Sequence, residues 1–547
     1  MPRFLRFLCI LAALAIIGVG LFTSEELSDA RWLGLLAIAW ILLLFGTRMP
    51  IGPDVPTFNR AVLRTAMTLA SMFAIISAQL VRIQVVQSDA TYNKTAKDPT
   101  GETISNPRKT SAELSAPRGK IYDRNGTLVA DTVKDGNAYL RDYPNPVTGY
   151  VAGYFSPLLY GSSGLESSRN DALSGKESID PVERTINALL GRQQQGLDLH
   201  LTLDTNLQQT ATDLLQGRKG AVVVLEVATG AVLVLASTPN YDPDRLVTSP
   251  SGDSSAAESY WAELSDDPDA PFVLRANLGL YTPGSTFKTI TAAAAIDSGL
   301  DTPTSVYTDN GELEIDGRTL VENNRPDETR SEWTLEEGIE WSLNVVFAQV
   351  GMHVGEDRLW DYAKRFGFGE EIPFDLPVSE SQLASDRDFL GSNNALADTA
   401  FGQGEIQVSP LHMAMIAATF ANGGKMMRPY LVASEQDGDG NVRNRASAEV
   451  WKTPISSATA ESVRSMMVSA VNEGSIQAAI TPGYTVGGKT GTAERGDGSV
   501  HSWLMAFIGD DTPRYAAAVV LEEGSDSLGT SVAVCQAILE ATITSLG

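Results

Sequence analysis

The chain has 547 residues and a formal net charge of −26, which together predict two or three domains and argue against a nucleic-acid-binding surface. Its hydrophobic content of 43% predicts folded cores rather than disorder. Cys9 lies in an apolar N-terminal segment and Cys535 lies near the C-terminus, so we expect no internal disulfide. The four histidines are scattered without the spacing of a metal site, and we expect neither a metal nor a cofactor.

Residues 1–87 are predicted to form a membrane region with up to three transmembrane segments. Apolar runs lie at about residues 7–22, 32–46 and 65–81, each short for a span of about 20 residues. The second run is marginal and is also compatible with a segment at the membrane interface. A cleaved signal peptide is the alternative for the first run, but the stretch 23–25 is a poor cleavage site, so a retained anchor is favoured.

The charges beside these runs predict their orientation. Arginines precede the first and third runs, whereas the loop after the first run is acidic. By the positive-inside rule, this pattern places the N-terminus in the cytoplasm, gives three crossings and leaves the chain after about residue 85 outside. The prediction depends on Arg3, Arg6, Arg48, Arg60, Arg64 and the acidic loop 24–29. We therefore expect a protein of the cell membrane.

Residues 88–215 form the second predicted region. Asn125-Gly126 stands between extended, partly apolar flanks, which predicts a tight hairpin turn. Residues 199–203 alternate like a strand, and Asp204 is expected to cap a helix that reaches Leu215. Four charged residues are interpreted as a structural ion-pair network rather than as catalytic groups: Arg118, Asp123, Arg124 and Glu166.

Residues 216–547 form the third predicted region. Two apolar runs flank Thr229-Gly230 and predict a buried hairpin. The polar, acidic stretch at about 249–269 predicts a surface loop or an entry segment. Hairpin strands, a helical block and closing strands are typical of an α+β sheet with helices packed on it. We expect helices at about 334–352, 410–422 and 531–546, and strands at 503–509 and 516–521.

The first chemical motif is Ser285-x-x-Lys288, which follows a Pro-Gly turn and opens an alanine-rich run. The run predicts a helix with Ser285 at its N-terminus, where backbone N–H groups favour a developing negative charge. Lys288 lies one turn along, so its amine can reach the serine hydroxyl and act as its base if burial or another cation lowers the lysine pKa. Taken alone, the motif more often marks a capping serine followed by a surface lysine.

The second motif is Ser342-Leu343-Asn344. The pattern Ser-x-Asn also begins at Ser168 and at Ser392, so it says little by itself. Ser342 is selected because, of the three, it alone meets both conditions: it lies between the other two motifs and it precedes an apolar helix. Its hydroxyl could relay protons between the lysine of the first motif and a leaving amine, while Asn344 could hydrogen-bond a substrate amide or that lysine.

The third motif is Lys489-Thr490-Gly491, followed by Thr492, and it occurs once. Glycines in a strand let another backbone approach closely, which suits a sheet edge where a peptide lies alongside. Lys489 would supply positive charge for a substrate carboxylate and help to lower the pKa of the first lysine. The N–H of Thr492, paired with that of Ser285, would form an oxyanion hole. Standing alone, Lys489 would be interpreted as an exposed strand lysine.

The three motifs in this order resemble the active-site motifs of the penicillin-binding protein and serine β-lactamase superfamily. The stretch 118–126 resembles the signature of class B penicillin-binding proteins, as do Gly164-Leu165-Glu166, Gly402-Gln403-Gly404 and Ala421-Asn422-Gly423-Gly424. The resemblance covers about residues 85–545 and is greatest to the actinobacterial PbpA type.

This resemblance implies a fold and an activity. The fold would be a transpeptidase domain at 216–547, with an antiparallel sheet and helices on both sides, preceded by an elongated, non-catalytic pedestal domain at 88–215 and by transmembrane helices. The activity would be that of a peptidoglycan D,D-transpeptidase, in which Ser285 attacks D-Ala-D-Ala and the acyl group passes to an amine of a neighbouring strand. The implied partners are peptidoglycan stem peptides, β-lactams that acylate Ser285, and a RodA- or FtsW-like membrane glycosyltransferase.

One departure and two alternatives remain. The family usually has one N-terminal crossing, whereas this chain offers up to three. A hydrolase of the same fold, a D,D-carboxypeptidase or β-lactamase, is the first alternative; Asn344 and the long pedestal argue against a class D β-lactamase. A non-catalytic β-lactam-binding membrane scaffold is the second. It is disfavoured because the set of candidate catalytic residues is intact: Ser285, Lys288, Ser342, Asn344 and Lys489.

Overall fold

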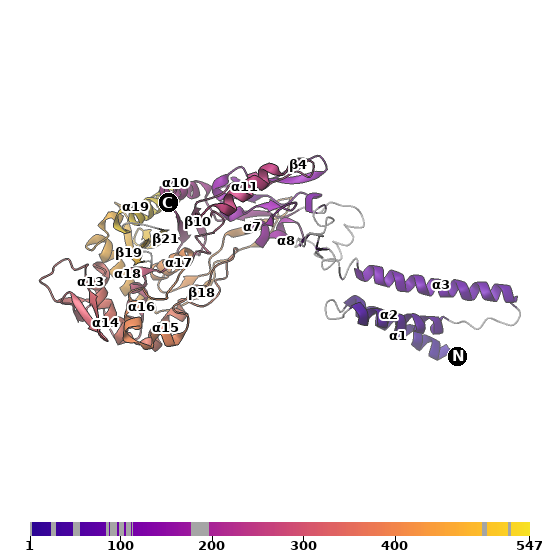
Figure 1. Ribbon diagram of the computed structural model, residues 1–547, viewed down its shortest axis with the longest axis horizontal. Coiled ribbons are helices and arrows are strands. Elements are labelled where there is room, and N and C mark those ends of the chain that lie inside the picture. The colour runs from indigo at the N-terminus through magenta and orange to yellow at the C-terminus, as the bar shows by residue number, and fades with distance from the viewer. Residues whose placement is uncertain are drawn as a thin grey trace. The chain divides into compact units, whose positions relative to one another are not determined.

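The computed structural model describes residues 3–22, 29–47, 55–83, 113–176, 196–494, 500–522 and 527–547, together with 87, 96–97, 103–104 and 111. The chain forms two compact units, Met1–Glu113 and Leu114–Gly547 (Figure 1). The predicted membrane region falls within the first unit, and the predicted transpeptidase region falls within the second. The boundary predicted at 215/216 stays a prediction.

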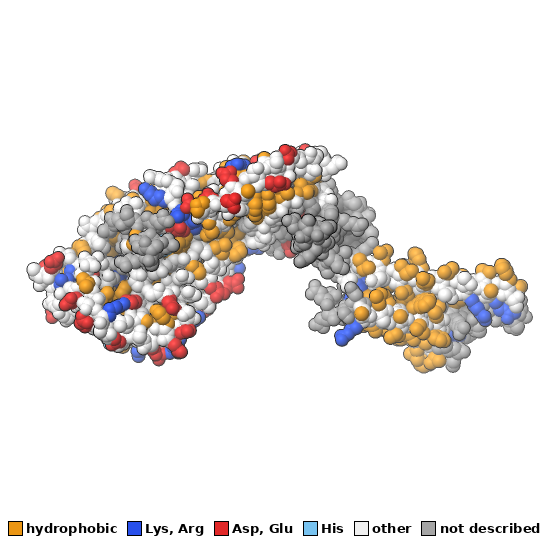
Figure 2. Space-filling model, viewed as in Figure 1, with side chains coloured by type: hydrophobic (Ala, Val, Ile, Leu, Met, Phe, Trp, Pro, Cys, Tyr) orange, Lys and Arg blue, Asp and Glu red, His pale blue; other side chains and the backbone are white. Residues whose placement is uncertain are grey.

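The first unit contains three long helices, α1 (Arg3–Phe22), α2 (Asp29–Gly46) and α3 (Thr57–Val81), at the three predicted apolar runs. Its apolar side chains are turned outward: Phe4, Phe58 and Phe73 are each more than 70% exposed. Hydrophobic side chains accordingly cover much of its surface (Figure 2). By length and composition α3 can cross a membrane. A two-stranded ribbon, β1 (Ala96–Lys97) and β2 (Thr103–Ile104), also lies in this unit.

Polar side chains join α2 to α3. Trp32 Nε1 donates to Gln79 Oε1 at 2.5 Å, and Trp40 Nε1 donates to Ser71 Oγ at 3.3 Å. The Arg82 guanidinium, directly after α3, lies 4.7 Å from the centre of the Trp32 ring. Hydrogen bonds between apolar helices favour a fixed pairing, because each group would otherwise lack a partner in an apolar surrounding. The two helices are therefore held in register within this unit.

The second unit begins with a six-stranded mixed sheet in the order β17-β16-β8-β3-β4-β5. Asn125-Gly126 joins β3 to β4, with Gly126 at a φ of 82°, which confirms the predicted hairpin. The strands β16 and β17 come from the predicted transpeptidase region and complete a sheet that the pedestal region starts. The strands are β3 (Ile121–Tyr122), β4 (Leu128–Asp135), β5 (Ala138–Asp142), β8 (Asp198–Leu201), β16 (Val432–Gln436) and β17 (Val442–Arg445).

Short elements connect β5 to β8 along the chain, and the predicted helix cap follows β8. The short elements are η2 (Pro146–Thr148), α6 (Gly149–Ala152), β6 (Phe155–Ser156), β7 (Gly161–Ser162), α7 (Gly164–Ser168) and α8 (Asn170–Leu173). After β8, Asp204 accepts hydrogen bonds from the N–H groups of Asn206 and Leu207 and begins α10 (Thr205–Leu215), which confirms the predicted cap and helix.

A five-stranded antiparallel sheet in the order β10-β9-β21-β20-β19 forms the centre of residues 216–547, the predicted catalytic part. It confirms the predicted hairpin at Thr229-Gly230 and both predicted closing strands. Side chains along β9, β10 and β21 are buried on both faces, which requires helices on both sides of the sheet. The strands are β9 (Gly220–Glu226), β10 (Val232–Thr238), β19 (Thr485–Glu494), β20 (Val500–Gly509) and β21 (Pro513–Leu521).

Two pairs of helices supply this cover (Figure 1). In the first, α10 packs against α19 (Val532–Leu546), and both contact the sheet; in the second, α17 (Pro410–Ala421) packs against α18 (Ser457–Asn472), and both contact the sheet. The predicted helices at 410–422 and 531–546 are thus confirmed. The segment Gly529–Leu546 is apolar enough to resemble a membrane span, but it contacts β20 and β21 as a core helix.

Two expectations for the catalytic part were wrong. The stretch 249–269 contains a helix, α11 (Ser255–Asp266), because Ala257, Tyr260 and Leu264 form a buried stripe at helical spacing among polar residues. The helix expected at 334–352 is two helices, α13 (Leu335–Glu340) and α14 (Asn344–Val354), because the chain turns at Ser342 with a φ of 61°.

The remaining elements surround these helices. They are η3 (Pro243–Leu246), η4 (Gly284–Phe287), α12 (Lys288–Asp297), β11 (Val306–Thr308), β12 (Glu312–Ile315), β13 (Arg318–Val321), β14 (Glu332–Thr334), α15 (Glu356–Arg365), η5 (Arg387–Gly391), α16 (Asn393–Ala400), β15 (Met426–Met427), β18 (Val450–Lys452), η6 (Gln477–Ala479) and η7 (Ser527–Ser531). Acidic side chains are spread over the face of the second unit seen in Figure 2, in keeping with the net charge of −26.

Candidate active site

Ser285 lies in the helical turn directly before α12. The turn η4 leads without a gap into α12, and Lys288 is the first residue of that helix. Ser285 is partly exposed, whereas Thr286, Phe287 and Lys288 are buried. The Ser285 hydroxyl therefore stands at an accessible helix start, as the Pro-Gly turn and the alanine-rich run predict.

Glycines allow the backbone of this turn to contact the backbone of two other segments, one at Gly402 and one in the third motif. The Gly284 N–H, at a φ of 55°, donates to Gly402 O at 2.9 Å. A Cβ on Gly402 would lie 1.8 Å from Gly284 O, and one on Gly491 would lie 2.3 Å from Pro283 O. No side chain fits in either place, so the serine turn lies directly against the backbone at Gly402 and against the Lys-Thr-Gly strand.

Lys288 is fully buried and is bound by the second motif. Its Nζ donates to Ser342 O at 2.5 Å, to Ser342 Oγ at 3.3 Å and to Asn344 Oδ1 at 2.8 Å. The amine also lies 5.6 Å from the centre of the Phe347 ring. The structure thus brings Lys288 together with Ser342 and Asn344, which lie 54 and 56 positions further along the sequence.

Two buried amines share this site. Burial lowers the pKa of Lys288 well below its ordinary value, the nearby Lys489 lowers it further, and Glu322 opposes both effects. Lys489 is also fully buried, and burial lowers its pKa to about 7. A lysine whose neutral form is favoured in this way can accept a proton near neutral pH.

No hydrogen bond between Lys288 Nζ and Ser285 Oγ is present among the residues that the structure describes. The acceptors of the amine lie on Ser342 and Asn344 instead. Their arrangement shows how the lysine is held and desolvated. The approach of its amine to the Ser285 hydroxyl stays a prediction.

The break between α13 and α14 turns the second motif toward Lys288. Ser342 adopts a φ of 61°, a left-handed conformation that costs a residue with a side chain about 1–3 kcal/mol. Its carbonyl accepts hydrogen bonds from Lys288 Nζ and, at 3.1 Å, from Asn324 Nδ2. The hydrogen bonds from Lys288 and Asn324 stabilise the strained turn at Ser342. The turn in its left-handed conformation directs both oxygens of Ser342 at the Lys288 amine.

The third motif lies on β19, which has a neighbouring strand on only one side in the five-stranded sheet. Thr492 is exposed, Thr490 is nearly buried, and Lys489 Nζ donates to Thr490 O at 3.4 Å. An outermost strand can receive an extended peptide alongside it. The strand therefore offers a place for a substrate backbone next to Ser285.

Glu322 and Gln403 lie at the site, although the sequence analysis did not select either as a site residue. Glu322 is nearly buried, and its carboxylate accepts the N–H groups of Val345 at 2.9 Å and Asn324 at 3.0 Å. It lies in a polar loop without a motif, so no sequence signal selects it. Gln403 Nε2 donates to Thr492 O at 3.3 Å. Its Gly-Gln-Gly context entered the sequence analysis only as part of the resemblance.

The pedestal charges divide into two groups. Glu166 is fully buried between two arginines: its Oε2 accepts from Arg118 Nε at 2.9 Å and its Oε1 accepts from Arg141 Nε at 2.5 Å. The Tyr143 hydroxyl also donates to Glu166 Oε1, at 3.3 Å. Burial lowers the pKa of Arg118, and the charge of Glu166 opposes this shift. Arg141 and Tyr143 are partners that the sequence reasoning missed.

Asp123 and Arg124 lie outside that cluster. The Asp123 carboxylate accepts the N–H groups of Asn125 and Thr127, both at 2.8 Å, and that of Thr205 at 3.1 Å. It therefore stabilises the hairpin turn and ties it to α10. Arg124 is exposed and donates its backbone N–H to Leu203 O at 3.0 Å; within the described residues its side chain forms no ion pair.

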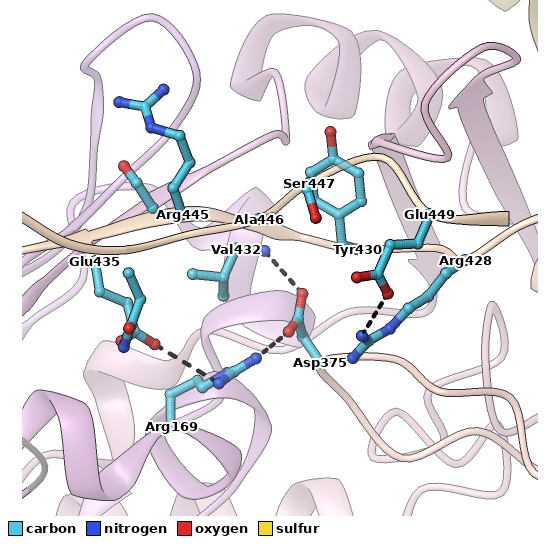
Figure 3. A pocket seen from close by; sticks show the side chains of 12 residues that line it. Arg169, Asp375, Arg428, Tyr430, Val432, Glu435, Arg445, Ala446, Ser447 and Glu449 are labelled. Atoms are coloured by element: carbon cyan, nitrogen blue, oxygen red, sulfur yellow. Dashed lines mark hydrogen bonds and ion pairs between the residues drawn. The ribbon is translucent and has the colours of Figure 1, made fainter. Parts of the chain in front are cut away.

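A cavity of about 260 Å³ lies away from the three motifs, where the pedestal meets β16 (Figure 3). Arg169 reaches between Asp375 and Glu435 and forms an ion pair with each. Asp375 Oδ2 also accepts the N–H groups of Leu431 at 2.5 Å and Val432 at 2.8 Å. These bonds tie the pedestal helices to β16, and the carboxylates that line the cavity are all bound by protein groups.

The chain is similar to known proteins over most of its length. Residues 220–540 match the family described as the penicillin-binding protein transpeptidase domain, and residues 118–199 match the penicillin-binding protein A dimerisation domain. The peptidoglycan D,D-transpeptidase PbpA of Mycolicibacterium smegmatis is 33% identical over 500 residues, covering 89% of this chain and 98% of that protein.

Solved structures agree with this similarity. The imipenem acyl-enzyme complex of penicillin-binding protein A from M. tuberculosis is 34% identical with a TM-score of 0.72, covering 79% of this chain and 99% of that one. The D,D-transpeptidase domain of a peptidoglycan glycosyltransferase from Eggerthella lenta is also 34% identical, with a TM-score of 0.70 and coverage of 79% and 99%.

Proposed function

Because the chain belongs to the family of penicillin-binding protein transpeptidases, we propose that it cross-links peptidoglycan as a serine D,D-transpeptidase that β-lactams inhibit covalently. The observation that carries this proposal is the buried Lys288, held by Ser342 and Asn344 one helical turn from Ser285. An amine desolvated beside a second lysine is suited to take a proton from a serine hydroxyl. The related acyl-enzyme structure with imipenem supports the same chemistry.

In the acylation step, the Oγ of Ser285 attacks the carbonyl carbon of the penultimate D-Ala, and its proton passes to the neutral Lys288. The oxyanion is stabilised by the N–H groups of Ser285 and Thr492. The C–N bond then breaks, and the terminal D-Ala leaves with a proton that Lys288 returns through the hydroxyl of Ser342. The product is an ester between the stem peptide and Ser285.

In the second step, an amine of a neighbouring stem peptide attacks this ester. It loses a proton to Lys288 as the C–O bond to Ser285 breaks, and that proton returns to the serine oxygen. Before acylation, Lys489 binds the carboxylate of the terminal D-Ala, which leaves in the first step. In both steps Asn344 binds an amide of the donor peptide, and the Thr490–Thr492 stretch pairs with its backbone. Arg118 and Glu166 have a structural role in the pedestal, together with Asp123 and Arg124 at the hairpin turn.

The first unit is proposed to anchor the catalytic part in the cell membrane with a cytoplasmic N-terminus and three crossings. Its outward apolar side chains and the arginines beside α1 and α3 support this topology. A RodA- or FtsW-like glycosyltransferase in the same membrane is the proposed partner. Phosphatase fusions after residues 26, 50 and 87 test the topology: the first and third should be active outside the cell and the second inactive, whereas an active second fusion would contradict three crossings.

Covalent labelling by a fluorescent penicillin tests the function. The full-length protein should be labelled at Ser285 and lose the label slowly, whereas Ser285→Ala should not be labelled although it folds. Ser298→Ala, which changes a serine at the end of the same helix, is the matched control and should label normally. Rapid loss of the label would indicate a hydrolase, and a wild-type protein without label would contradict the proposal.

A further inference from the structure

The segment 322–324, which follows the hairpin β12–β13, lies against the break between α13 and α14. Glu322 is 7% exposed, and its Oε2 accepts the Val345 N–H at 2.9 Å. Val345 is the second residue of α14, and Leu343 at the cap position offers no side-chain acceptor. Glu322 therefore supplies from another segment the negative cap that α14 lacks, at the helix end where a carboxylate is favoured.

Asn324 holds the other end of the same stretch. Its Nδ2 donates at 3.1 Å to Ser342 O, the carbonyl that also accepts from Lys288 Nζ. The Asn324 N–H in turn donates to Glu322 Oε1 at 3.0 Å. The segment 322–324 thus binds both ends of the stretch 342–345, through Ser342 O and the Val345 N–H. Within the described residues, this stretch provides the hydrogen-bond acceptors of Lys288.

The hairpin that carries this segment is itself fixed to the catalytic part. Arg318 makes a two-pronged ion pair with Asp398 on α16, at 2.6 and 2.5 Å, and the Glu322 N–H donates to Gly311 O at 2.8 Å. The helix α16 leads into Gly402, whose carbonyl accepts the Gly284 N–H beside the nucleophile. The position of Glu322 is therefore set by the same framework that sets Ser285.

The charge balance around Lys288 gives Glu322 a second role. Within the described residues, two charged side chains act on Lys288: Lys489 from β19 opposes its protonated form, and Glu322 favours it. Both are nearly buried, so water screens their effects little. Glu322 is the one negative charge in this balance.

We propose that Glu322 is a positioning residue of the transpeptidase site, which caps the helix carrying Asn344 and sets by its charge the pH range in which Lys288 acts as base. This inference rests on the proposed function, in which a neutral Lys288 takes the proton of Ser285. Asn324 shares the positioning role and has no charge, so the two roles can be separated by substitution.

The test is the rate of acylation of the full-length protein by a fluorescent penicillin, followed from mildly acidic to mildly alkaline pH. Glu322→Gln keeps one acceptor oxygen and the shape of the side chain but removes the charge. Without the carboxylate the pKa of Lys288 falls further, so the acidic limb of the rate profile should move to lower pH while the maximal rate decreases. Asn324→Ala should lower the rate by about tenfold at every pH and leave the limb in place.

Glu312→Gln is the matched control, because it makes the same change of charge at an exposed position of the same hairpin. It should alter neither the rate nor the limb. A Glu322→Gln variant with a lower rate and an unmoved limb would mean that Glu322 only supports the fold, and the inference would fail. If that variant does not fold by circular dichroism, Glu322→Ala, which removes the charge without placing an amide N–H against the Val345 N–H, decides: a limb at lower pH supports the inference, and a limb at the wild-type position overturns it.

Absence of label on the wild-type protein would contradict the proposed function itself. This result differs from a moved or an unmoved acidic limb in Glu322→Gln, which concern the inference about Glu322. A wild-type protein that is labelled and has an acidic limb satisfies the premise. The comparison among the variants then concerns Glu322 alone.

Discussion

The pedestal and the catalytic part each bury a cluster of charged side chains, but they balance the charge differently. In the pedestal, Glu166 lies between Arg118 and Arg141, and each guanidinium has a carboxylate oxygen as partner. In the catalytic part, Lys288 and Lys489 are buried as two amines whose acceptors are neutral oxygens. Arginine stays protonated in such a setting, whereas lysine responds by a lowered pKa.

The difference shows how one physical cost, the burial of charge, serves two purposes. Where opposite charges meet and their hydrogen bonds are satisfied, the cluster is fixed and holds β5 and α7 together. Where like charges meet, a proton is held weakly and can be exchanged. The pedestal cluster is thus suited to structure, and the lysine pair is suited to chemistry.

The largest effect should follow from removing the amine at the centre of the lysine pair. Lys288→Met should slow acylation by a fluorescent penicillin by about 10²–10⁴-fold, because the serine loses its base. The melting temperature should change little, because the relief of burying an amine offsets the hydrogen bonds lost at Ser342 and Asn344. Lys425→Met, at an exposed position, is the control and should affect neither. Unchanged acylation in Lys288→Met would reject its role.

The pedestal cluster should respond in the opposite sense. Glu166→Gln leaves two buried guanidinium groups without their counter-charge and should lower the free energy of unfolding by about 3–5 kcal/mol. The molecules that still fold should be acylated at the wild-type rate. Urea denaturation and penicillin labelling of the same samples measure both, and Asp171→Asn, an exposed change of charge on α8, is the control. Loss of acylation without loss of stability would show that the cluster acts on the active site.

His412 is a third buried titratable group, and it is neutral at neutral pH. His412 is fully buried; because Phe366 O can only accept, Nε2 carries the proton and Nδ1 accepts from the Ser381 hydroxyl. Burial lowers the pKa of His412 to about 4. Its contribution to stability is therefore complete above a pH of about 6.5 and is lost as the pH falls toward 4, on the order of 3 kcal/mol in total.

Denaturation at about pH 7 and about pH 5 measures this loss. His412→Gln should be less stable at the higher pH but should lose less on acidification than the wild type. His353→Gln, at an exposed position, should follow the wild-type pH dependence. An equal loss in all three proteins would assign the acid sensitivity to other groups.

The smallest effect concerns Lys489 and the charge of the ligand. Because its pKa is lowered to about 7, the amine loses its charge as the pH rises through that value. Initial binding of a penicillin carboxylate should weaken by about tenfold across this transition, since one charge-assisted hydrogen bond is lost. The methyl ester of the same penicillin should bind equally on both sides of it. Parallel behaviour of the acid and the ester would remove Lys489 from carboxylate binding.

Local chemistry made parts of this fold predictable. Asn125-Gly126 and Thr229-Gly230 demand tight turns, and Asp204 is a strong helix cap, so these elements follow from neighbouring residues alone. The three motifs are likewise found from the sequence alone, because their residue types and their order along the chain identify the candidate site. The stretch 249–269 misled because its acidic residues hide a stripe of only three buried side chains.

The missed features depend on contacts between distant segments. The turn at Ser342 is held by Asn324 and Lys288, which local helix propensity cannot register. Glu322 and Arg141 stand in stretches without a motif, and only the folded chain shows that they face Lys288 and Glu166. The addition of β16 and β17 to the pedestal sheet is likewise a matter of topology.

That shared sheet limits how the molecule can be divided. A fragment cut at 215/216 would keep β16 and β17 but lose β8, the strand against which β16 pairs from Val432 to Gln436. The exposed backbone of β16 would then be open to pairing with other chains, a known route to aggregation. For the same reason, a catalytic cassette could not be exchanged between relatives at a single junction. The pedestal is therefore an integral part of the compact unit that begins at Leu114, and it cannot be detached as a separate spacer.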